Sequence, residues 1–259
     1  MTKDRGLELL NQLTREGRTA VSATEVQTTM GLSPQATSNL LTRLTRAGLL
    51  DRVVAGRYAI RQLGNLGTSA VWDDLGSAVA ALFAPHAHRI GFLTALDHHG
   101  LLVRPVRPVQ VASPFRPREN SLTGRPLRVV RESEATVLIG TQPLGPSRLA
   151  TVERALLDTA SRPALTGGAA RLAEALAAVR ATSGLRDLAE RVGGGAAYRR
   201  IGSIAATLSL PVADGLERLP WRTLVELDRR ARGEGGWVDT TWGVAWPYPP
   251  SELEAVVAS

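Results

Sequence analysis

Polar side chains recur along residues 33–48 at the spacing of one helical face. The members of this polar face are Gln35, Ser38, Asn39, Thr42, Arg43 and Arg46. Asn and Gln amides can form two hydrogen bonds with the edge of an adenine, and guanidinium groups bind phosphate oxygens. We therefore expect Gln35, Ser38 and Asn39 to contact the bases of double-stranded DNA. Arg43 and Arg46 lie one and two turns further on the same side, and we expect them to contact its phosphates.

The residues around this polar face predict the helix that presents it. Ser33 is a favourable N-cap, Pro34 suits the first helical position, and Gly48 ends the pattern. The opposite face carries Ala36, Leu40, Leu41, Leu44 and Ala47. The major groove of DNA admits one helix, which needs an outward face of hydrogen-bonding residues and an inward face packed on its neighbours. We therefore interpret residues 34–47 as a recognition helix.

Three further elements in residues 1–62 would hold such a helix in place. They are a helix over residues 7–13, a helix that starts after Ser22 and ends by Gly31, and two short strands within residues 49–60. Ala55-Gly56 supplies a tight turn between the strands. Together these elements predict a winged helix-turn-helix, and Arg52 and Arg57 in its wing are expected to reach the DNA backbone or minor groove. The alternative is that this region packs against protein and that its arginines form a solvated face.

Arginines are densest between residues 104 and 131, where seven of them accompany a single acidic residue, Glu119. They are Arg104, Arg107, Arg116, Arg118, Arg125, Arg128 and Arg131. Five prolines keep the connections in this basic segment extended. We expect the first six arginines to form a second surface that contacts the phosphate backbone beside the wing. Solvated loops between strands are the alternative for the same residues.

The remainder of the chain predicts an α+β fold. Residues 63–69 show no helical or strand period and contain two glycines, so we expect a linker to a second domain over residues 70–259. The expected helices of this domain span residues 72–83, 90–99, 152–159, 170–181, 185–192, 197–208 and 221–231. Its expected strands span residues 109–112, 127–130, 137–139 and 237–246.

Composition narrows the classes of function. The 259 residues include no cysteine, which excludes disulfides, zinc thiolate sites and cysteine nucleophiles. A net charge of +7 favours a polyanionic partner, because basic surface neutralises phosphates and releases their counterions. No apolar stretch approaches the length of a membrane span, and no apolar leader follows Met1. We therefore expect a cytoplasmic location and no membrane partner.

No catalytic or cofactor-binding motif is present in the sequence. We find no Gly-x-Ser-x-Gly elbow, Walker loop, dinucleotide fingerprint or zinc-protease helix, so neither an enzyme nor a cofactor is expected. The four histidines are His86, His88, His98 and His99. A metal site made from them is disfavoured, because adjacent histidines on a helix point about 100° apart and do not grip one ion easily.

Several local stretches resemble one known family. They are Gly48-Leu49-Leu50 followed by Gly56-Arg57-Tyr58, Leu93-Thr94-Ala95-Leu96 with His99-Gly100-Leu101, Thr151-Val152-Glu153-Arg154-Ala155-Leu156-Leu157-Asp158, and Arg199-Arg200-Ile201-Gly202. Together with the order of parts, they make most of the chain similar to the AbiEi family of type IV toxin–antitoxin antitoxins. Thr151-Val152 departs from the Ser-Pro pair that the family often has before Glu153, which affects only that turn.

The resemblance implies a transcriptional repressor of its own operon that binds inverted repeats in the promoter. It also implies a functional pairing with a nucleotidyltransferase-like toxin encoded beside it, whose effect the C-terminal domain counteracts. In this family the winged helix reads DNA, and the basic surface of the C-terminal domain is thought to help hold it. Two alternatives stay open. One is a ligand-sensing regulator whose residues 70–259 form an effector pocket. The other, which the missing motifs disfavour, is an enzyme with a DNA-targeting domain in which Asp97 and Glu153 would pair.

Overall fold

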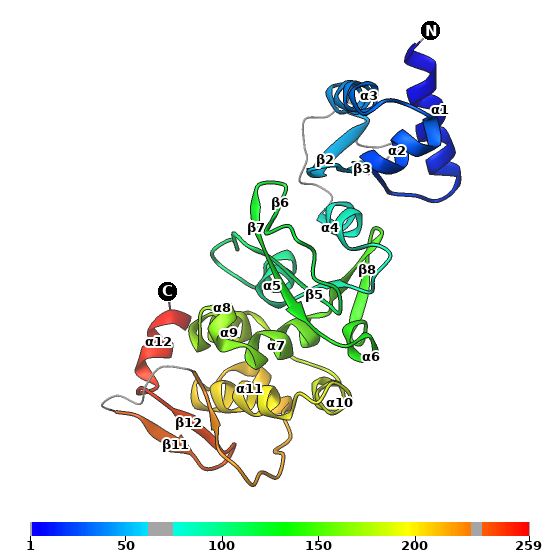
Figure 1. The fold of residues 1–259 in the computed structure, drawn as a ribbon. Coiled ribbons are helices and arrows are strands. Elements are labelled where there is room, and N and C mark those ends of the chain that lie inside the picture. The colour runs from blue at the N-terminus through cyan, green and yellow to red at the C-terminus, as the bar shows by residue number, and fades with distance from the viewer. Residues whose placement is uncertain (1, 62–74, 229–234, 259) are drawn as a thin grey trace.

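The computed structural model describes residues 2–61, 75–228 and 235–258 (Figure 1). Helices and three separate sheets share these residues, so the α+β fold class predicted from the sequence is confirmed. Figure 1 shows the N-terminal elements at one end, a central sheet in the middle, and a group of helices with a small sheet at the other end. The linker expected over residues 63–69 lies outside the described residues.

The N-terminal region combines three helices with a three-stranded antiparallel sheet. The helices are α1 (Thr2–Arg15), α2 (Ala23–Met30) and α3 (Pro34–Arg46), and the strands are β1 (Ala20–Ser22), β2 (Leu50–Val54) and β3 (Arg57–Ile60). Strand β3 lies between β1 and β2. The expected helices and hairpin are all present. The sequence does not predict β1, because three residues are too few to show an alternating pattern.

Local signals at the turns fix where α2 and α3 begin and where α2 ends. The Ser22 hydroxyl oxygen accepts a hydrogen bond from the Glu25 amide at 3.1 Å, and the Glu25 carboxylate accepts one from the Ser22 amide at 3.4 Å. Gly31 ends α2 with a φ of +61°. The Ser33 hydroxyl then caps α3 by accepting a hydrogen bond from the Ala36 amide at 3.3 Å. The turn between the two helices is therefore set by the same residues that predict it.

The sheet of the N-terminal region contacts two apolar cores. The core shared with helices α1–α3 consists of Leu9, Leu10, Leu13, Val21, Val26, Leu40, Leu41, Leu44 and Leu50. Val53 and Ala59 instead belong to the core of the rest of the molecule, where the sheet contacts α4 (Leu75–Phe83). The Thr123 amide also donates a hydrogen bond to the Val53 carbonyl oxygen at 3.3 Å. The N-terminal region is thus packed against the rest of the chain through its sheet.

Six short strands form the central sheet in the part of the chain that the structure describes. They are β4 (Arg89–Ile90), β5 (Val109–Ser113), β6 (Ser121–Leu122), β7 (Arg125–Arg131), β8 (Thr141–Leu144) and β9 (Ser147–Ala150). Their order across the sheet is β6-β7-β5-β4-β9-β8. The pairs β5–β7 and β4–β9 are parallel and the other pairs are antiparallel. The strands expected over residues 109–112 and 127–130 correspond to β5 and β7.

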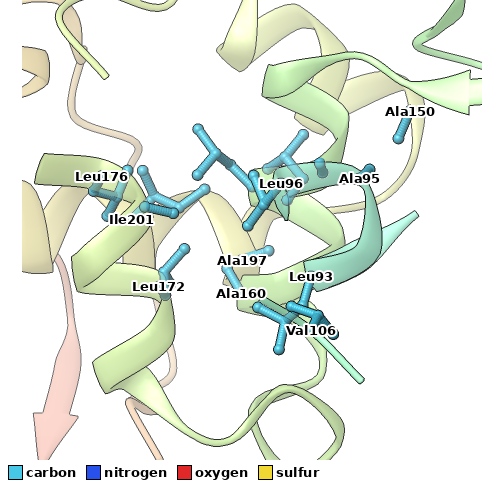
Figure 2. Close-up of a cluster of buried hydrophobic side chains, with 14 of the residues drawn as sticks. Leu93, Ala95, Leu96, Val106, Ala150, Ala160, Leu172, Leu176, Ala197 and Ile201 are labelled. Carbon is cyan, nitrogen blue, oxygen red and sulfur yellow. The ribbon is translucent and has the colours of Figure 1, made fainter. Parts of the chain in front are cut away.

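The remaining described elements are helices and a small three-stranded sheet. The helices are α5 (Phe92–His98), α6 (Glu134–Val137), α7 (Val152–Ser161), α8 (Pro163–Thr166), α9 (Ala169–Ala178), α10 (Leu185–Arg191), α11 (Gly195–Thr207), a 3₁₀ turn (Pro211–Gly215) and α12 (Ser251–Val257). The strands are β10 (Val225–Glu226), β11 (Trp237–Asp239) and β12 (Val244–Trp246). Figure 2 shows part of the core, in which Leu96 of α5, Leu176 of α9 and Ile201 of α11 lie in one cluster.

Some expectations for the chain after residue 75 are wrong. Residues 137–139 form no strand, since Val137 ends α6 and Ile139 lies in a turn. Residues 221–228 form a loop and β10 instead of a helix, and residues 229–231 lie outside the described ranges. Residues 237–246 form two antiparallel strands, β11 and β12, instead of one. The helix expected from Ile90 begins at Phe92, because Ile90 belongs to β4.

Within the described residues, no helix has both the length and the apolar character needed to cross a lipid bilayer.

Candidate nucleic-acid interface

The side chains of α3 that we expect to contact DNA share one exposed helix face. They are Gln35, Ser38, Asn39, Arg43 and Arg46, and all five are exposed. The opposite face is buried and consists of Thr37, Leu40, Leu41 and Leu44. Ala47, expected to point inward, is exposed because it is already the C-cap of α3. The helix therefore has the two faces that a helix in the major groove requires.

Two of the expected base-contacting residues bind each other in this structure. The Gln35 side-chain amide donates a hydrogen bond to the Asn39 amide oxygen at 3.2 Å, one turn further along α3. This pair is exposed, so exchanging its hydrogen bond for one with a base edge has a small net cost. Arg43 and Arg46 lie in the last turn of α3, where their charge also interacts favourably with the helix dipole.

The two arginines of the hairpin differ in what they contact. Arg52 on β2 is exposed. Arg57 on β3 is only partly exposed, and its Nη1 donates hydrogen bonds to the carbonyl oxygens of Ala81 at 3.1 Å and Leu82 at 3.3 Å in α4. The expectation that Arg57 projects from the wing toward DNA is therefore corrected, because its guanidinium group is directed to the end of α4.

The arginines of the basic segment between residues 104 and 131 lie in the connections before and after β5 and on β7. Arg104 and Arg107 precede β5, Arg116 and Arg118 follow it, and Arg125 and Arg128 lie on β7. Five of these six are exposed. Arg125 is the exception, since it donates hydrogen bonds to the carbonyl oxygens of Val106 at 2.5 Å and Arg107 at 2.9 Å and thereby fixes the loop before β5. Strand β6 of this segment contacts β2, so the segment adjoins the hairpin that carries Arg52.

Four charged side chains that link β4, α7 and the chain after β7 are absent from the sequence-based expectations. Three of them are buried, and the fourth, Glu132, is partly exposed. Arg89 on β4 is fully buried, and its guanidinium group contacts the carboxylates of Glu132 at 2.7 Å and Asp158 at 2.8 Å. Arg154 on α7 contacts the same two carboxylates at 2.5 Å and 2.9 Å. We call these four residues the buried ionic cluster. Each carboxylate in it bridges two guanidinium groups.

The buried ionic cluster also fixes the chain between β7 and β8. Arg89 Nη1 donates a hydrogen bond to the Val137 carbonyl oxygen at 2.7 Å, and Arg154 Nη1 donates one to the Ile139 carbonyl oxygen at 3.0 Å. One local signal for the cluster exists in the sequence, because Arg154 and Asp158 are spaced for an i,i+4 pair on one helix. No local pattern indicates that Arg89 joins them from a strand, since the ion pair spans 69 positions of sequence.

The two arginines of this cluster lower the pKa of Glu132. Burial alone would raise the pKa of this carboxyl, but the hydrogen bonds and charges of Arg89 and Arg154 outweigh it and hold the pKa below its ordinary value. A carboxyl whose pKa is lowered by folding adds stability above its unfolded pKa, near 4.3 for Glu, and this stability is lost as the pH falls through the folded pKa. The contribution of Glu132 is therefore fully present at neutral pH.

Histidine and acidic side chains do not assemble a metal site in the described ranges, where no group of three or more of them could hold an ion. The ring centroids of His98 and His99 lie 6.1 Å apart, and the ring planes are nearly perpendicular. His99 Nε2 lies 2.8 Å from the Ala150 carbonyl oxygen, and the Asp97 carboxylate accepts a hydrogen bond from the Val106 amide at 3.1 Å. These contacts give the groups structural roles in holding α5.

Comparison with known proteins supports the fold. No family model matches the chain. No curated protein matches it either. Among solved structures, the crystal structure of the RV2827C protein from Mycobacterium tuberculosis is similar, with a TM-score of 0.60 and 18% sequence identity. The likeness covers 96% of this chain and 92% of that one, so the same arrangement of elements extends over nearly the whole of both.

Proposed function

We propose that this chain is a DNA-binding transcriptional repressor and that residues 1–62 act as a winged helix-turn-helix. The exposed face of α3 carries the proposal. Its side chains are of the types that bind base edges and phosphates in protein–DNA complexes. Its opposite face is packed on the other helices. The hairpin β2–β3 follows α3 directly, as a wing would. Arg52 is its exposed cation.

The basic segment supports a second contact with the same DNA. It adjoins β2 through β6, and most of its arginines are exposed. Because phosphate contacts are made along a continuous backbone, a basic surface beside the hairpin adds affinity without adding sequence preference. In this proposal Arg125 does not contact DNA but holds the loop before β5 in place, since its guanidinium group is bound to carbonyl oxygens of that loop.

A binding titration on the DNA upstream of its own gene, at several salt concentrations, tests the proposal. The wild type is expected to bind this duplex tightly and a scrambled duplex of equal length weakly. Arg43→Ala is expected to lower the affinity and to reduce the slope of log affinity against log salt by about 1, because one phosphate contact is lost. Arg180→Ala is the control, since it removes an equal charge from an exposed position beyond α9. If neither duplex binds, the N-terminal region is a protein-interaction module and the proposal is wrong.

We further propose that the chain is the antitoxin of a type IV toxin–antitoxin system, acting in the cytoplasm without a catalytic role or a cofactor. The stretches that resemble the AbiEi family support this role, and the repressor activity suits it because such antitoxins repress their own operon. Deleting the gene beside an intact neighbour is expected to arrest growth, and supplying the chain from a plasmid should restore it. A neighbouring gene without nucleotidyltransferase character, or unaffected growth, would argue against the antitoxin role.

A further inference from the structure

A groove runs along the end of β7 and the junction of α7 and α8. Its larger part has a volume of about 670 Å³ and is lined by Val129–Arg131, Ser161–Leu165, Arg200, Glu226 and Asp228. A smaller part of about 290 Å³ lies over the buried ionic cluster, since Glu132, Arg154 and Asp158 line it. The two parts share Val130, Arg131, Ser161 and Arg162 and are therefore adjacent, and we call them together the Arg131–Arg162 groove.

Two cationic side chains stand where the two parts of the groove meet. Arg131 and Arg162 are both exposed. Among the residues that the structure describes, neither guanidinium group has a hydrogen bond or an ion pair. The charges of the buried ionic cluster beneath them neutralise one another, because it contains two arginines and two carboxylates. Arg131 and Arg162 are therefore available to an anion that enters the groove.

The far end of the larger part is polar. Arg200 donates hydrogen bonds to the carbonyl oxygens of Glu226 at 2.7 Å and Ala160 at 2.9 Å. Burial, and after it the charge of Arg199, lowers the pKa of Arg200, and the charges of Asp228 and Glu226 offset only part of this effect. The carboxylates of Glu226 and Asp228 line the same end. The larger part thus has three arginines against two carboxylates along its walls.

Backbone strain occurs at the smaller part of the groove. Phe92 lines it, is buried, and has a φ of +56°, which bulky L-residues rarely adopt. The preceding Gly91 has no room for a side chain, because a Cβ there would lie 2.8 Å from a carboxylate oxygen of Asp158. Strained residues of this kind persist where the surroundings hold them, and they are concentrated at binding and catalytic sites. The strain is thus an observation, independent of the charges, that points to the same groove.

We propose that the Arg131–Arg162 groove binds a small phosphorylated ligand of mononucleotide size, with its phosphate between Arg131 and Arg162. A planar guanidinium group matches the geometry of phosphate oxygens. The volume lies within the range of small-molecule pockets, about 300–1,000 Å³. The exposed Glu226 suits a hydroxyl group of a sugar, and Val129 and Leu165 offer an apolar surface to a base. Such a site would make the chain a regulator that senses a small molecule, which is one of the alternatives left open by the sequence.

Isothermal titration of the full chain with AMP, adenosine and inorganic phosphate tests this site. AMP is expected to bind saturably, and adenosine, which lacks the phosphate, at least about tenfold more weakly. The double variant Arg131→Gln/Arg162→Gln is expected to bind AMP about 10–100-fold more weakly, because hydrogen bonds to a charged phosphate are lost. Both side chains are exposed, so the variant should keep the fold. Arg180→Gln/Arg218→Gln removes the same charge outside the groove and should bind AMP as the wild type does.

Two results would overturn the proposal. One is the absence of saturable binding of AMP and of inorganic phosphate at millimolar concentration, and the other is equal binding of AMP by the wild type and the groove double variant. A separate arm with duplex DNA identifies the competing explanation. If the groove double variant loses affinity for DNA while no phosphorylated small molecule binds, the groove belongs to the DNA contact and holds no ligand of its own. The AMP titration contains no DNA, so its failure and that of the repressor proposal are distinguishable.

Discussion

Replacing Asp158 with alanine is expected to lower the free energy of unfolding by about 3–5 kcal/mol. The Asp158 carboxylate contacts the guanidinium groups of Arg89 at 2.8 Å and Arg154 at 2.9 Å, and neither arginine side chain is more than 3% exposed. Without it, Glu132 is left as the single carboxylate partner of two buried cations. Removing one member of a buried ionic group destabilises strongly because an uncompensated charge stays behind. Urea denaturation at neutral pH, followed by circular dichroism, measures the change.

An exposed ion pair provides the matched control for this prediction. Glu190 pairs with Arg186 at 3.2 Å on the surface of α10, and Glu190→Gln is expected to leave the unfolding midpoint unchanged, since exposed pairs contribute little. Asp158→Asn keeps the shape of the side chain and provides a measurement if the alanine variant does not fold. A loss for Asp158→Ala no larger than that for Glu190→Gln would show that the buried ionic cluster does not hold the fold together.

Alanine at Gly202 is expected to destabilise the protein by about 1–3 kcal/mol, the range for overpacking a filled core. Gly202 lies on α11, where a Cβ would overlap the ring of Trp242. That ring is buried, and β12, which begins two residues after it, packs against α11, so the ring has little room to retreat. The free energy of unfolding from urea titration, read together with the near-ultraviolet signal of the tryptophans, measures both the loss and any movement of Trp242.

The same substitution elsewhere on α11 is expected to have the opposite sign. A Cβ at Gly195 would meet no atom within 4 Å, so Gly195→Ala should stabilise the chain by about 0.4–1 kcal/mol by restricting the unfolded state. The two variants share their helix and their chemistry, and they differ in what the new methyl group touches. Equal effects from the two would mean that helix propensity, and not the close contact with Trp242, decides stability at Gly202.

The ends of α2 and α3 and the exposed face of α3 can be predicted from the residues nearby in sequence. Ser33 caps the helix it is expected to cap, α2 begins directly after Ser22 as expected, and Gly31 adopts the left-handed conformation at the end of α2. Each of these signals acts within three or four residues, so no knowledge of the fold is needed to read it. The exposed face of α3 follows for the same reason, because its spacing alone separates outward from inward positions.

The incorrect expectations involve contacts between distant parts of the chain. Val137 and Ile139 have the side chains of a strand, yet their carbonyl oxygens accept hydrogen bonds from Arg89 and Arg154 at the end of α6 and in the turn that follows it. The segment after residue 220 has a helical pattern, but the buried Arg199 takes the Thr223 carbonyl oxygen as an acceptor at 2.9 Å. A long arginine side chain reaches across the fold, and no local pattern shows which carbonyl group it will reach.

The long reach of arginine side chains also explains which features of the candidate site can be predicted from the sequence and which cannot. The positions of Arg52 and Arg57 in a hairpin are predictable, but the direction of each guanidinium group is not, since Arg57 binds acceptors 24 and 25 positions away. Arg125 likewise binds carbonyl groups 18 and 19 positions earlier. The Arg131–Arg162 groove has no local signal either, because its walls come from β7, the α7–α8 junction, α11 and β10.

The hydrogen bonds of Arg57 join the N-terminal region to the end of α4. The last carbonyl groups of a helix have no partner within it, and in α4 two of these acceptors, on Ala81 and Leu82, receive hydrogen bonds from the region that carries α3. We therefore expect closure of the last turn of α4 and attachment of the N-terminal region to share one opening equilibrium. Hydrogen exchange at the amides near Phe83 would thus report, from another part of the molecule, how firmly α3 is held.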